Sequence, residues 1–318
     1  MKNFALIGAS GYIAPRHMKA IKETRNNLVA AFDPYDGIGI IDSNFPEAYF
    51  FTEYELFESF VERCQRSEEQ KIEYISIASP NYLHYSHIRA ALQNASHAIC
   101  EKPLVLDPKE IDELLAMEKN SGKKVYTVLQ LRLHDSIVAL KKKIADELKQ
   151  NPNKIYEIDL TYITSRGRWY FASWKGDEAK SGGIASNIGV HFFDMLSWIF
   201  GEVKESFVHV KQADINAGFM RLKNANVRWF LSVNYEHVPN ELKAAGQRTY
   251  RSIKINDEEI EFSEGFTDLH TKSYQDILDG GGFGLEDARG SINIVSEIRE
   301  LTPLGLRGEY HPFCIKVT

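Results

Sequence analysis

Short apolar runs alternate with longer amphipathic stretches through the first part of the chain. The runs are mainly hydrophobic and are bounded by polar or glycine-containing segments; they cover residues 4–8, 28–32, 74–78, 97–100 and 125–131. Between them, apolar positions recur at helical spacing in residues 15–24, 85–93 and 108–121. This alternation predicts βαβ units, and therefore a parallel sheet that helices cover on both faces.

The pattern changes after Lys124, where long segments alternate apolar and polar residues with few helical stretches between them. These strand candidates are residues 154–164, 205–213, 218–225, 227–235 and 250–263, and the helical interruptions are residues 189–200 and 269–278. Alternation of this kind predicts a large, mostly antiparallel open sheet with one packed face. We therefore expect two closely joined domains, an α/β domain over residues 1–124 and an α+β domain over residues 125–318.

Composition and charge narrow the possible partners. The 318 residues are 43% hydrophobic and 26% charged, as in ordinary globular proteins, and the formal net charge of -6 disfavours broad binding to nucleic acid or anionic membranes. No apolar run reaches the ~18 residues of a membrane span. Three widely spaced cysteines form no CxxC pair, which favours a reducing cytoplasm, and no His/Cys spacing typical of a metal site occurs, so we expect no metal.

A glycine loop follows the first predicted strand directly. Gly8, Gly11 and Ala14 have the G-x-x-G-x-x-A spacing that gives a tight turn, close backbone approach to a pyrophosphate and close helix packing. The second predicted strand ends at Asp33, whose carboxylate can accept hydrogen bonds from ribose hydroxyls and repel a 2′-phosphate. The pair predicts an NAD site; an ordinary βα turn and a turn-forming aspartate before Pro34 are the alternatives.

Three other polar residues are candidates for catalysis. Lys102 follows a predicted buried strand, and Asn187 and His191 stand four residues apart in a mainly apolar segment. A neutral imidazole can accept a proton at physiological pH, and an ammonium can stabilise a developing alkoxide. From the residues alone, each of the three also has a structural explanation. His191 could be a core histidine, Lys102 a loop lysine paired with Glu101, and Asn187 a helix cap.

Four segments together resemble the Gfo/Idh/MocA family of sugar oxidoreductases over essentially the whole chain. They are the glycine loop, ASPNYLHYSHIRAAL (78–92), ICEKPLVLDPKE (99–110) and GGIASNIGVHFFDM (182–195). The resemblance implies a Rossmann domain followed by an α+β domain, NAD as cofactor, and hydride transfer from a sugar hydroxyl, with Lys102 and His191 in the site. Asn187 stands where the family often has Asp, which argues against a proton relay there and for a positioning role.

The same resemblance implies which residues contact the cofactor. The resemblance places the cofactor against the glycine loop and against the ends of later strands. The implied set is Gly8, Gly11, Tyr12, Ile13, Asp33, Ser79, Asn81, His84, Glu101, Lys102 and Gln130.

A narrower resemblance concerns the substrate. GASGYIAPRHMKAI, residues 165–196 and GFGLEDAR (282–289) are similar to the UDP-N-acetylglucosaminuronate 3-dehydrogenases, which supply an aminotransferase in bacterial surface-polysaccharide synthesis. A UDP-linked uronate carries carboxylate and diphosphate groups, so the basic and aromatic residues after residue 164 are candidate contacts: Arg166, Arg168, Trp174 and Lys175, with Lys102, Asn187 and His191 at the sugar.

Several alternatives remain open at this point. The substrate could be a different sugar or a cyclitol, and a non-catalytic NAD-binding sensor is the rival from another class. The basic and aromatic loop could be a surface ion-pair loop. The resemblance further implies a homo-oligomer, a tetramer or dimer, and 2-oxoglutarate as a hydride acceptor that recycles NADH.

Overall fold

The computed structural model describes residues 1–37, 39–260 and 268–317. The chain divides into two compact units, one formed by Met1–Leu133 and Thr267–Arg289 and the other by His134–Phe266 and Gly290–Thr318. The first unit thus extends past residue 124 and also includes the later segment Thr267–Arg289. It does so because the strand at residues 125–127 pairs with the first sheet, and because residues 269–278 pack into the same core.

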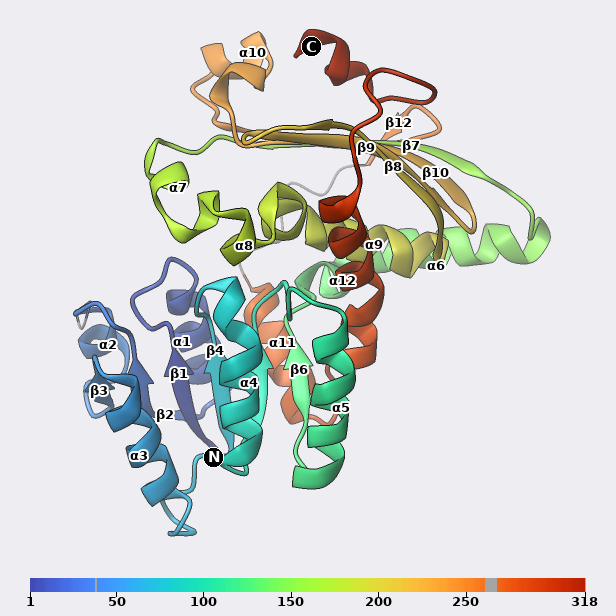
Figure 1. Ribbon diagram of the computed structural model, residues 1–318. Coiled ribbons are helices and arrows are strands. Elements are labelled where there is room, and N and C mark those ends of the chain that lie inside the picture. The colour runs from blue at the N-terminus through green and yellow to red at the C-terminus, as the bar shows by residue number, and fades with distance from the viewer. Residues whose placement is uncertain (38, 261–267, 318) are drawn as a thin grey trace. The chain divides into compact units, whose positions relative to one another are not determined.

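The first unit is built on a parallel six-stranded sheet (Figure 1) with the strand order β3-β2-β1-β4-β5-β6. The strands are β1 (Asn3–Ile7), β2 (Asn27–Phe32), β3 (Tyr49–Phe51), β4 (Tyr74–Ile77), β5 (His97–Cys100) and β6 (Val125–Thr127). One face packs against α1 (Ala14–Glu23), α2 (Gly39–Asn44) and α11 (Leu269–Leu278). The other packs against α3 (Tyr54–Cys64), α4 (His84–Gln93) and α5 (Lys109–Ser121).

Helix α1 shows why the first core forms. Ala14, Met18 and Ile21 recur at spacings of four and three residues, so they lie on one face of the helix, and all three are fully buried. They pack with Phe4 and Leu6 of β1 and with residues of α11. The helix that follows the glycine loop is therefore held against the sheet by an apolar stripe along one face.

The second unit contains a mixed six-stranded sheet with the order β12-β11-β7-β10-β9-β8. Its strands are β7 (Tyr156–Thr164), β8 (Val203–Lys211), β9 (Ile215–Leu222), β10 (Ala225–Ser232), β11 (Thr249–Ile255) and β12 (Glu258–Glu259). Neighbours are antiparallel except β10 and β7, which pair in parallel. The helices are α6 (Asp135–Gln150), α7 (Trp169–Ala172), α8 (Glu178–Ser181), α9 (Val190–Phe200), α10 (Asn240–Ala244) and α12 (Leu285–Glu300), the last of which begins in the first unit.

The core of the second unit centres on Trp229. This side chain is fully buried, and its ring meets Phe193 of α9 edge to face at 5.3 Å. Opposite Trp229 on the neighbouring strand lies Gly218, where an added Cβ would stand 2.5 Å from the indole and 2.2 Å from the carbonyl oxygen of Phe207. The glycine is thus needed for the indole to lie against the sheet.

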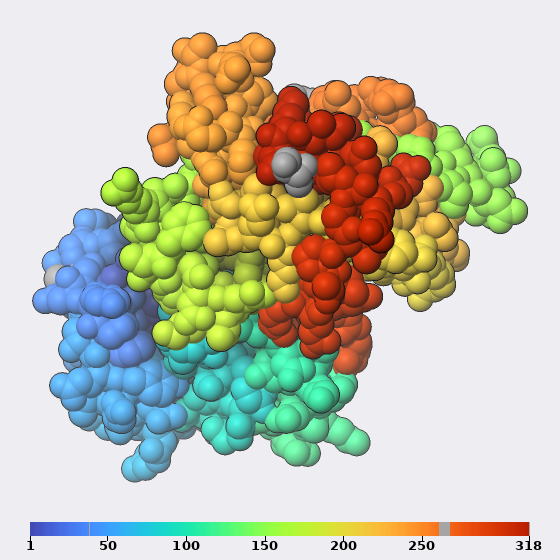
Figure 2. All heavy atoms as spheres, turned by 45° about the horizontal axis from the view of Figure 1, so that its top comes forward, coloured from blue at the N-terminus to red at the C-terminus, as the bar shows by residue number. Residues whose placement is uncertain are grey.

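The opposite face of this sheet is partly covered by the C-terminal residues. Phe313 and Cys314 pack with Ile163, Ile215 and Phe230 in a second apolar cluster. Figure 2 shows this terminal segment, coloured red, lying over the yellow strands. The main chain of Leu304 also donates to the carbonyl of Val208 of β8 at 2.8 Å, which fixes the segment along the sheet.

The predicted fold class is confirmed, and the differences are local. The strand expected over residues 125–131 ends at Thr127 and gives way to a 3₁₀ turn, Gln130–Leu133. The pattern did not predict helices α3, α6 and α12, strand β3 or the short helix α2. The strand candidate at residues 250–263 divides into β11 and β12, and its residues 261–263 lie outside the described part of the chain.

Two further observations concern the cysteines and hydrophobicity. Cys64, Cys100 and Cys314 are buried and carry free thiols. Among the described residues, none of the helices combines the length and the apolar character that crossing a bilayer requires.

Gly218 and Gly290 provide a matched pair for testing the core. Gly218→Ala should destabilise the protein by about 3 kcal/mol or more, because the new methyl group meets a backbone carbonyl and a packed indole. Gly290 lies inside α12, and, apart from its own helix backbone and chain neighbours, no atom of the described residues lies within 4 Å of the point that an added methyl group would occupy, so Gly290→Ala should stabilise by about 0.5–1 kcal/mol. Thermal melting of both variants measures the difference; a Gly218→Ala melting temperature equal to that of the parent protein would contradict this packing.

Candidate cofactor and catalytic sites

The glycine loop joins β1 to α1 and has the backbone geometry of a phosphate-binding turn. Gly8 has a φ of 87°, and an added Cβ would lie 2.6 Å from the carbonyl group of Ala78, so the position accepts only glycine. Gly11 donates its N–H to the Gly8 carbonyl at 3.1 Å. Helix α1 then starts without a side-chain cap, so its first N–H groups are not satisfied by a capping side chain.

Asp33 lies beside this loop at the carboxyl end of β2. One carboxylate oxygen accepts the Ser10 N–H at 2.9 Å, and the other accepts the Tyr35 N–H at 3.0 Å. The second contact is the turn contact that the sequence left open as an alternative, while the first ties the carboxylate to the glycine loop. Both oxygens retain further lone pairs for hydroxyl donors.

The residues that follow β4 and β6 lie at the same edge of the sheet, because carboxyl ends of parallel strands share one edge. Ser79 contacts His87 through its hydroxyl at 2.8 Å. Asn81 is buried at the start of a 3₁₀ turn, Asn81–Leu83. Oε1 of Gln130 is buried and accepts no hydrogen bond within the part of the chain that the structure describes.

The side chain of His84, a predicted cofactor contact, lies between two main-chain carbonyl groups. Its side chain is fully buried, and its two ring nitrogens lie 2.7 Å from the Pro103 carbonyl and 2.9 Å from the Ser79 carbonyl. Burial lowers the pKa of His84, while the two carbonyls raise it less. The imidazole therefore links the turn after β5 to the segment after β4; a direct cofactor contact stays a prediction.

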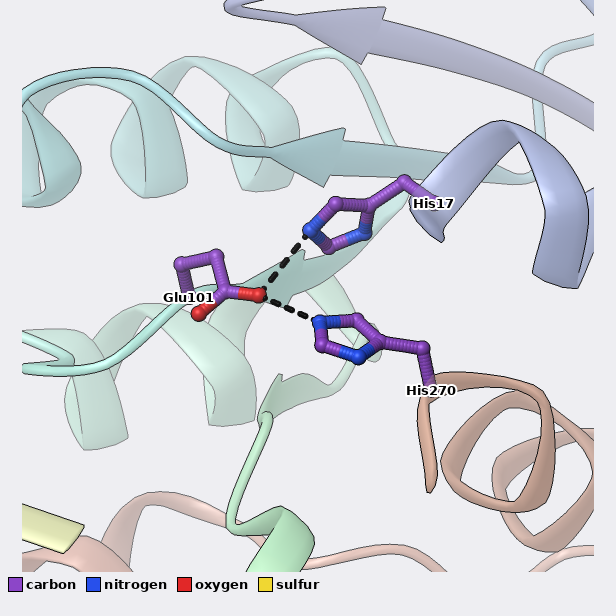
Figure 3. A group of neighbouring side chains, drawn as sticks. All are labelled: His17, Glu101 and His270. Atoms are coloured by element: carbon purple, nitrogen blue, oxygen red, sulfur yellow. Dashed lines mark hydrogen bonds and ion pairs between the residues drawn. The ribbon is translucent and has the colours of Figure 1, made fainter. Parts of the chain in front are cut away.

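Glu101 and Lys102 follow β5 at this edge. Glu101 is 8% exposed, and its Oε2 accepts the backbone N–H of Lys102 at 3.3 Å. Its Oε1 contacts two imidazoles, His17 of α1 at 3.1 Å and His270 of α11 at 2.8 Å (Figure 3). No sequence spacing indicated these two histidines, because they come from segments far before and far after Glu101.

The three side chains also raise the question of a metal. The ligand atoms of His17, Glu101 and His270 all lie within 4.8 Å of one another. Both N···O distances are those of ordinary hydrogen bonds, and two N–H donors on one carboxylate oxygen satisfy all three groups. The absence of a metal stays a prediction, and hydrogen bonding accounts for the cluster.

The described residues of the first unit fit a bound dinucleotide. Gly8 allows a tight turn against the main chain of Ala78, the start of α1 is uncapped, a carboxylate ends β2, and Gln130 brings a buried acceptor without a partner in the described chain. The loop residues Tyr12 and Ile13 would hold the pyrophosphate through their main-chain N–H groups, while Gly8 and Gly11 shape the turn through hydrogen bonds within the chain. Asp33 would hold the adenosine ribose.

The predicted catalytic residues of the second unit lie at the start of α9. Asn187 is in a π-helical turn, Ala185–Gly189, and His191 is the second residue of α9, partly exposed. The Asn187 amide donates to the Tyr170 hydroxyl at 2.9 Å. Helix α9 itself has no side-chain cap, so Asn187 is not its N-cap. π-Turns occur often at functional sites, which agrees with the role expected for this segment.

Two further side chains around this segment are buried. Asp194 is 2% exposed, because α9 turns this side into the core. No pattern in the sequence indicated a role for Tyr170, which is 1% exposed and bonded to Asn187. Burial raises the pKa of Tyr170, so its hydroxyl keeps its proton.

The basic and aromatic residues after β7 form a cluster in the same unit. The Lys175 ammonium lies 4.3 Å from the centre of the Trp174 ring and 6.0 Å from that of Trp169. Burial and the neighbouring Arg166 lower the pKa of Lys175. Arg166 and Arg168 are exposed, and Figure 2 shows this yellow-green segment at the surface of its unit. Two like charges at such a site are suited to binding an anion.

Comparisons with known proteins agree with both units. Residues 2–129 match the model of an oxidoreductase family with an NAD-binding Rossmann fold, and residues 152–244 match that family's C-terminal alpha/beta domain. A WlbA (WbpB) dehydrogenase from Thermus thermophilus, in complex with NAD and alpha-ketoglutarate, is 51% identical with a TM-score of 0.94, over 98% of this chain and 100% of that one. The same dehydrogenase with NAD and UDP-GlcNAcA gives 50% identity, a TM-score of 0.93 and the same coverage.

Curated relatives are more distant. The D-glucoside 3-dehydrogenase of Escherichia coli (strain K12) is 26% identical over 134 residues, which is 41% of this chain and 36% of that protein. The matches to three of these relatives, the glucoside dehydrogenase included, span from 36% to 54% of their lengths.

The two family models cover more than half of the chain, in the order of its two units, and the first of them describes the fold that carries the glycine loop and Asp33. The chain therefore belongs to the Gfo/Idh/MocA oxidoreductase family and has its NAD-binding Rossmann fold.

Proposed function

We propose that this chain is an NAD-dependent dehydrogenase that oxidises the C3 hydroxyl of UDP-N-acetylglucosaminuronic acid (UDP-GlcNAcA) to the 3-keto sugar nucleotide. The observation that carries the proposal is the 50% identity over 98% of the chain with a dehydrogenase crystallised with NAD and UDP-GlcNAcA. The placement of the glycine loop and Asp33 supports the cofactor half independently. The product is a ketone suited to a partner aminotransferase of surface-polysaccharide synthesis in the cytoplasm.

The chain's own residues supply the acid–base part of the reaction. NAD, when bound, supplies the hydride acceptor. His191 takes the proton of the sugar hydroxyl, for which a partly exposed imidazole at the start of a helix is suited. Lys102 hydrogen-bonds to the same oxygen and stabilises the negative charge that develops on it. Asn187, oriented by the Tyr170 hydroxyl, positions the sugar and moves no proton.

The charges of the substrate agree with the basic cluster of the second unit. UDP-GlcNAcA carries a diphosphate and a carboxylate, and Arg166, Arg168 and Lys175 offer guanidinium and ammonium donors beside Trp174. A neutral substrate such as a free cyclitol would leave these cations without an anionic partner. The cluster therefore favours the nucleotide sugar over the cyclitol.

Two features of the relatives extend the proposal. The Thermus enzyme was crystallised with alpha-ketoglutarate as well as NAD, so 2-oxoglutarate is the proposed acceptor that reoxidises NADH here. Assembly into a tetramer or dimer is proposed for this chain as for its family.

A substrate panel tests the activity. With NAD and 2-oxoglutarate present, the protein should convert UDP-GlcNAcA to its 3-keto product, detected by mass spectrometry after borodeuteride trapping. UDP-GlcNAc, which has a hydroxymethyl group in place of the carboxylate, is the matched control and should react about 10- to 100-fold more slowly, because a hydrogen bond to a charged group contributes about 1.5–3 kcal/mol. Turnover of free inositol or glucose with none of UDP-GlcNAcA would refute the substrate assignment.

Substitution of the proposed catalytic side chains tests their roles. His191→Asn should lower kcat by about 100-fold or more, because general-base catalysis contributes that much. Lys102→Met should do the same through lost stabilisation of the alkoxide. His191→Asn should bind NAD with a Kd within about threefold of the parent, since this residue is not among the predicted cofactor contacts. Parental turnover in either variant would remove that residue from the mechanism.

Asp33 tests the cofactor preference. Asp33→Asn keeps the size of the side chain but removes the charge that binds ribose hydroxyls and repels a 2′-phosphate, so the Kd for NAD should rise roughly tenfold and the preference for NAD over NADP should shrink. The exposed Asp36 of the same loop is the matched control, and Asp36→Asn should leave both values unchanged. Fluorescence titration with each cofactor measures them; an unaltered NAD/NADP ratio in Asp33→Asn would contradict the assignment.

A further inference from the structure

Glu101 joins three separate segments of the first unit through one carboxylate oxygen. His17 lies in α1, directly after the glycine loop, and His270 lies in α11, which returns from a later part of the chain. Figure 3 shows both rings pointing at Oε1, with N···O distances of 3.1 and 2.8 Å. The two histidines are 0% and 3% exposed, so water contributes little to holding this carboxylate.

The direction of every hydrogen bond in the cluster follows from the protonation states. Burial alone would raise the pKa of Glu101, but the bonds from His17 and His270 hold that pKa well below its usual range. Burial lowers the pKa of His17, so this imidazole is neutral and has one N–H. If Nε2–H donates to Glu101, Nδ1 must accept, and the Tyr274 hydroxyl lies 2.7 Å away to donate to it. Ser76 lies 2.6 Å from the same hydroxyl and donates in turn.

The other carboxylate oxygen connects this network to Lys102. Glu101 Oε2 accepts the Lys102 N–H, and the Glu101 N–H donates to the Ile77 carbonyl of β4 at 2.9 Å. His84 contacts the carbonyl of the next residue, Pro103. The main chain on both sides of Lys102 is therefore fixed by buried side chains.

We propose that His17 and His270 are positioning residues for Lys102. By donating together to Oε1, they hold the Glu101 carboxylate in the orientation in which Oε2 accepts the main-chain N–H of Lys102. Lys102 then presents its ammonium to the substrate. The proposal rests on the catalytic role of Lys102 given above. The reacting groups touch neither histidine, so both act through Glu101.

The titratable groups around Glu101 come from each element that packs against it. They are His17 on α1, His270 and Tyr274 on α11, His84 on α4, and the chain neighbours Cys100 and Lys102. Burial raises the pKa of Cys100 well above its usual range and raises that of Tyr274, so both stay neutral near pH 7. Of the groups named here, Glu101 is therefore the one whose charge chiefly changes when a donor histidine is lost.

Three variants separate positioning from general stability. His270→Leu removes the donor, whereas His270→Gln places an amide N–H near the position of Nε2. His97 lies in the same unit at the opposite end of β5, where its Nδ1 accepts the Lys124 N–H at 3.0 Å, so His97→Leu is the matched control. Thermal melting curves identify the temperatures at which all three variants are folded, and the assays are run there.

The pH profile of kcat is the discriminating measurement. In the parent protein Glu101 is charged throughout, so its titration contributes no acid limb above about pH 5.5, given a usual carboxyl pKa near 4.3. In His270→Leu the buried carboxylate loses a donor and its pKa rises, so kcat should fall about 10- to 100-fold, and the loss relative to the parent should grow as the pH falls. His270→Gln should recover at least tenfold of the loss, and His97→Leu should remain within about twofold of the parent.

A second readout needs no substrate or cofactor. Carbon NMR of the ligand-free protein, labelled at its glutamate carboxyl groups and assigned with Glu101→Gln, should show Glu101 titrating at higher pH in His270→Leu than in His270→Gln or the parent. Equal kcat losses in the Leu and Gln variants with unchanged pH profiles would overturn the proposal, as would stoichiometric transition metal in the purified protein. If Lys102→Met keeps full activity, the proposed function of Lys102 fails; if only the His270 variants keep it, this inference alone fails.

Discussion

A buried carboxylate must either give up its charge or be met by donors, and the first unit meets Glu101 with two imidazoles. That choice constrains everything around it. His17 can donate only if α1 follows the glycine loop in a position that brings the imidazole to Glu101. His270 can donate only if α11 packs into the same core. The helix after the glycine loop, the lysine after β5 and a helix from late in the chain are therefore joined through one carboxylate.

The same edge of the sheet carries the other polar groups of the first unit. Gly8 follows β1, Asp33 follows β2, and Lys102 follows β5, so each lies where a parallel strand ends. Main-chain groups do much of the positioning: Asp33 is held by two N–H donors and Lys102 by its own N–H. The backbone path at this edge is closely constrained, since a Cβ at Gly8 would collide with the main chain of Ala78.

The elements that could be predicted from the sequence are those whose pattern is local. The strand at residues 97–100 and the helix at residues 269–278 have the bounds read from their apolar spacing, and the glycine loop is marked by its own residues. Helix α6 was missed because its sequence, DSIVALKKKIADELKQ, is dominated by charged residues and buries only a narrow stripe. The partnership of Glu101 with His270 could not be read at all, because spacing along the chain has no bearing on contacts 169 residues apart.

Asn187 shows how one uncharged side chain changes the proton path. The amide donates to Tyr170, and the buried phenol keeps its proton, so neither group can pass a proton onward at neutral pH. An aspartate at this position would instead accept from the phenol and could exchange a proton with the base. In the proposed reaction, the proton taken by His191 must therefore leave by another route, and the partial exposure of that imidazole provides one directly to water. The proposal thus gives the Asn187–Tyr170 pair a positioning role and leaves proton release to the histidine alone.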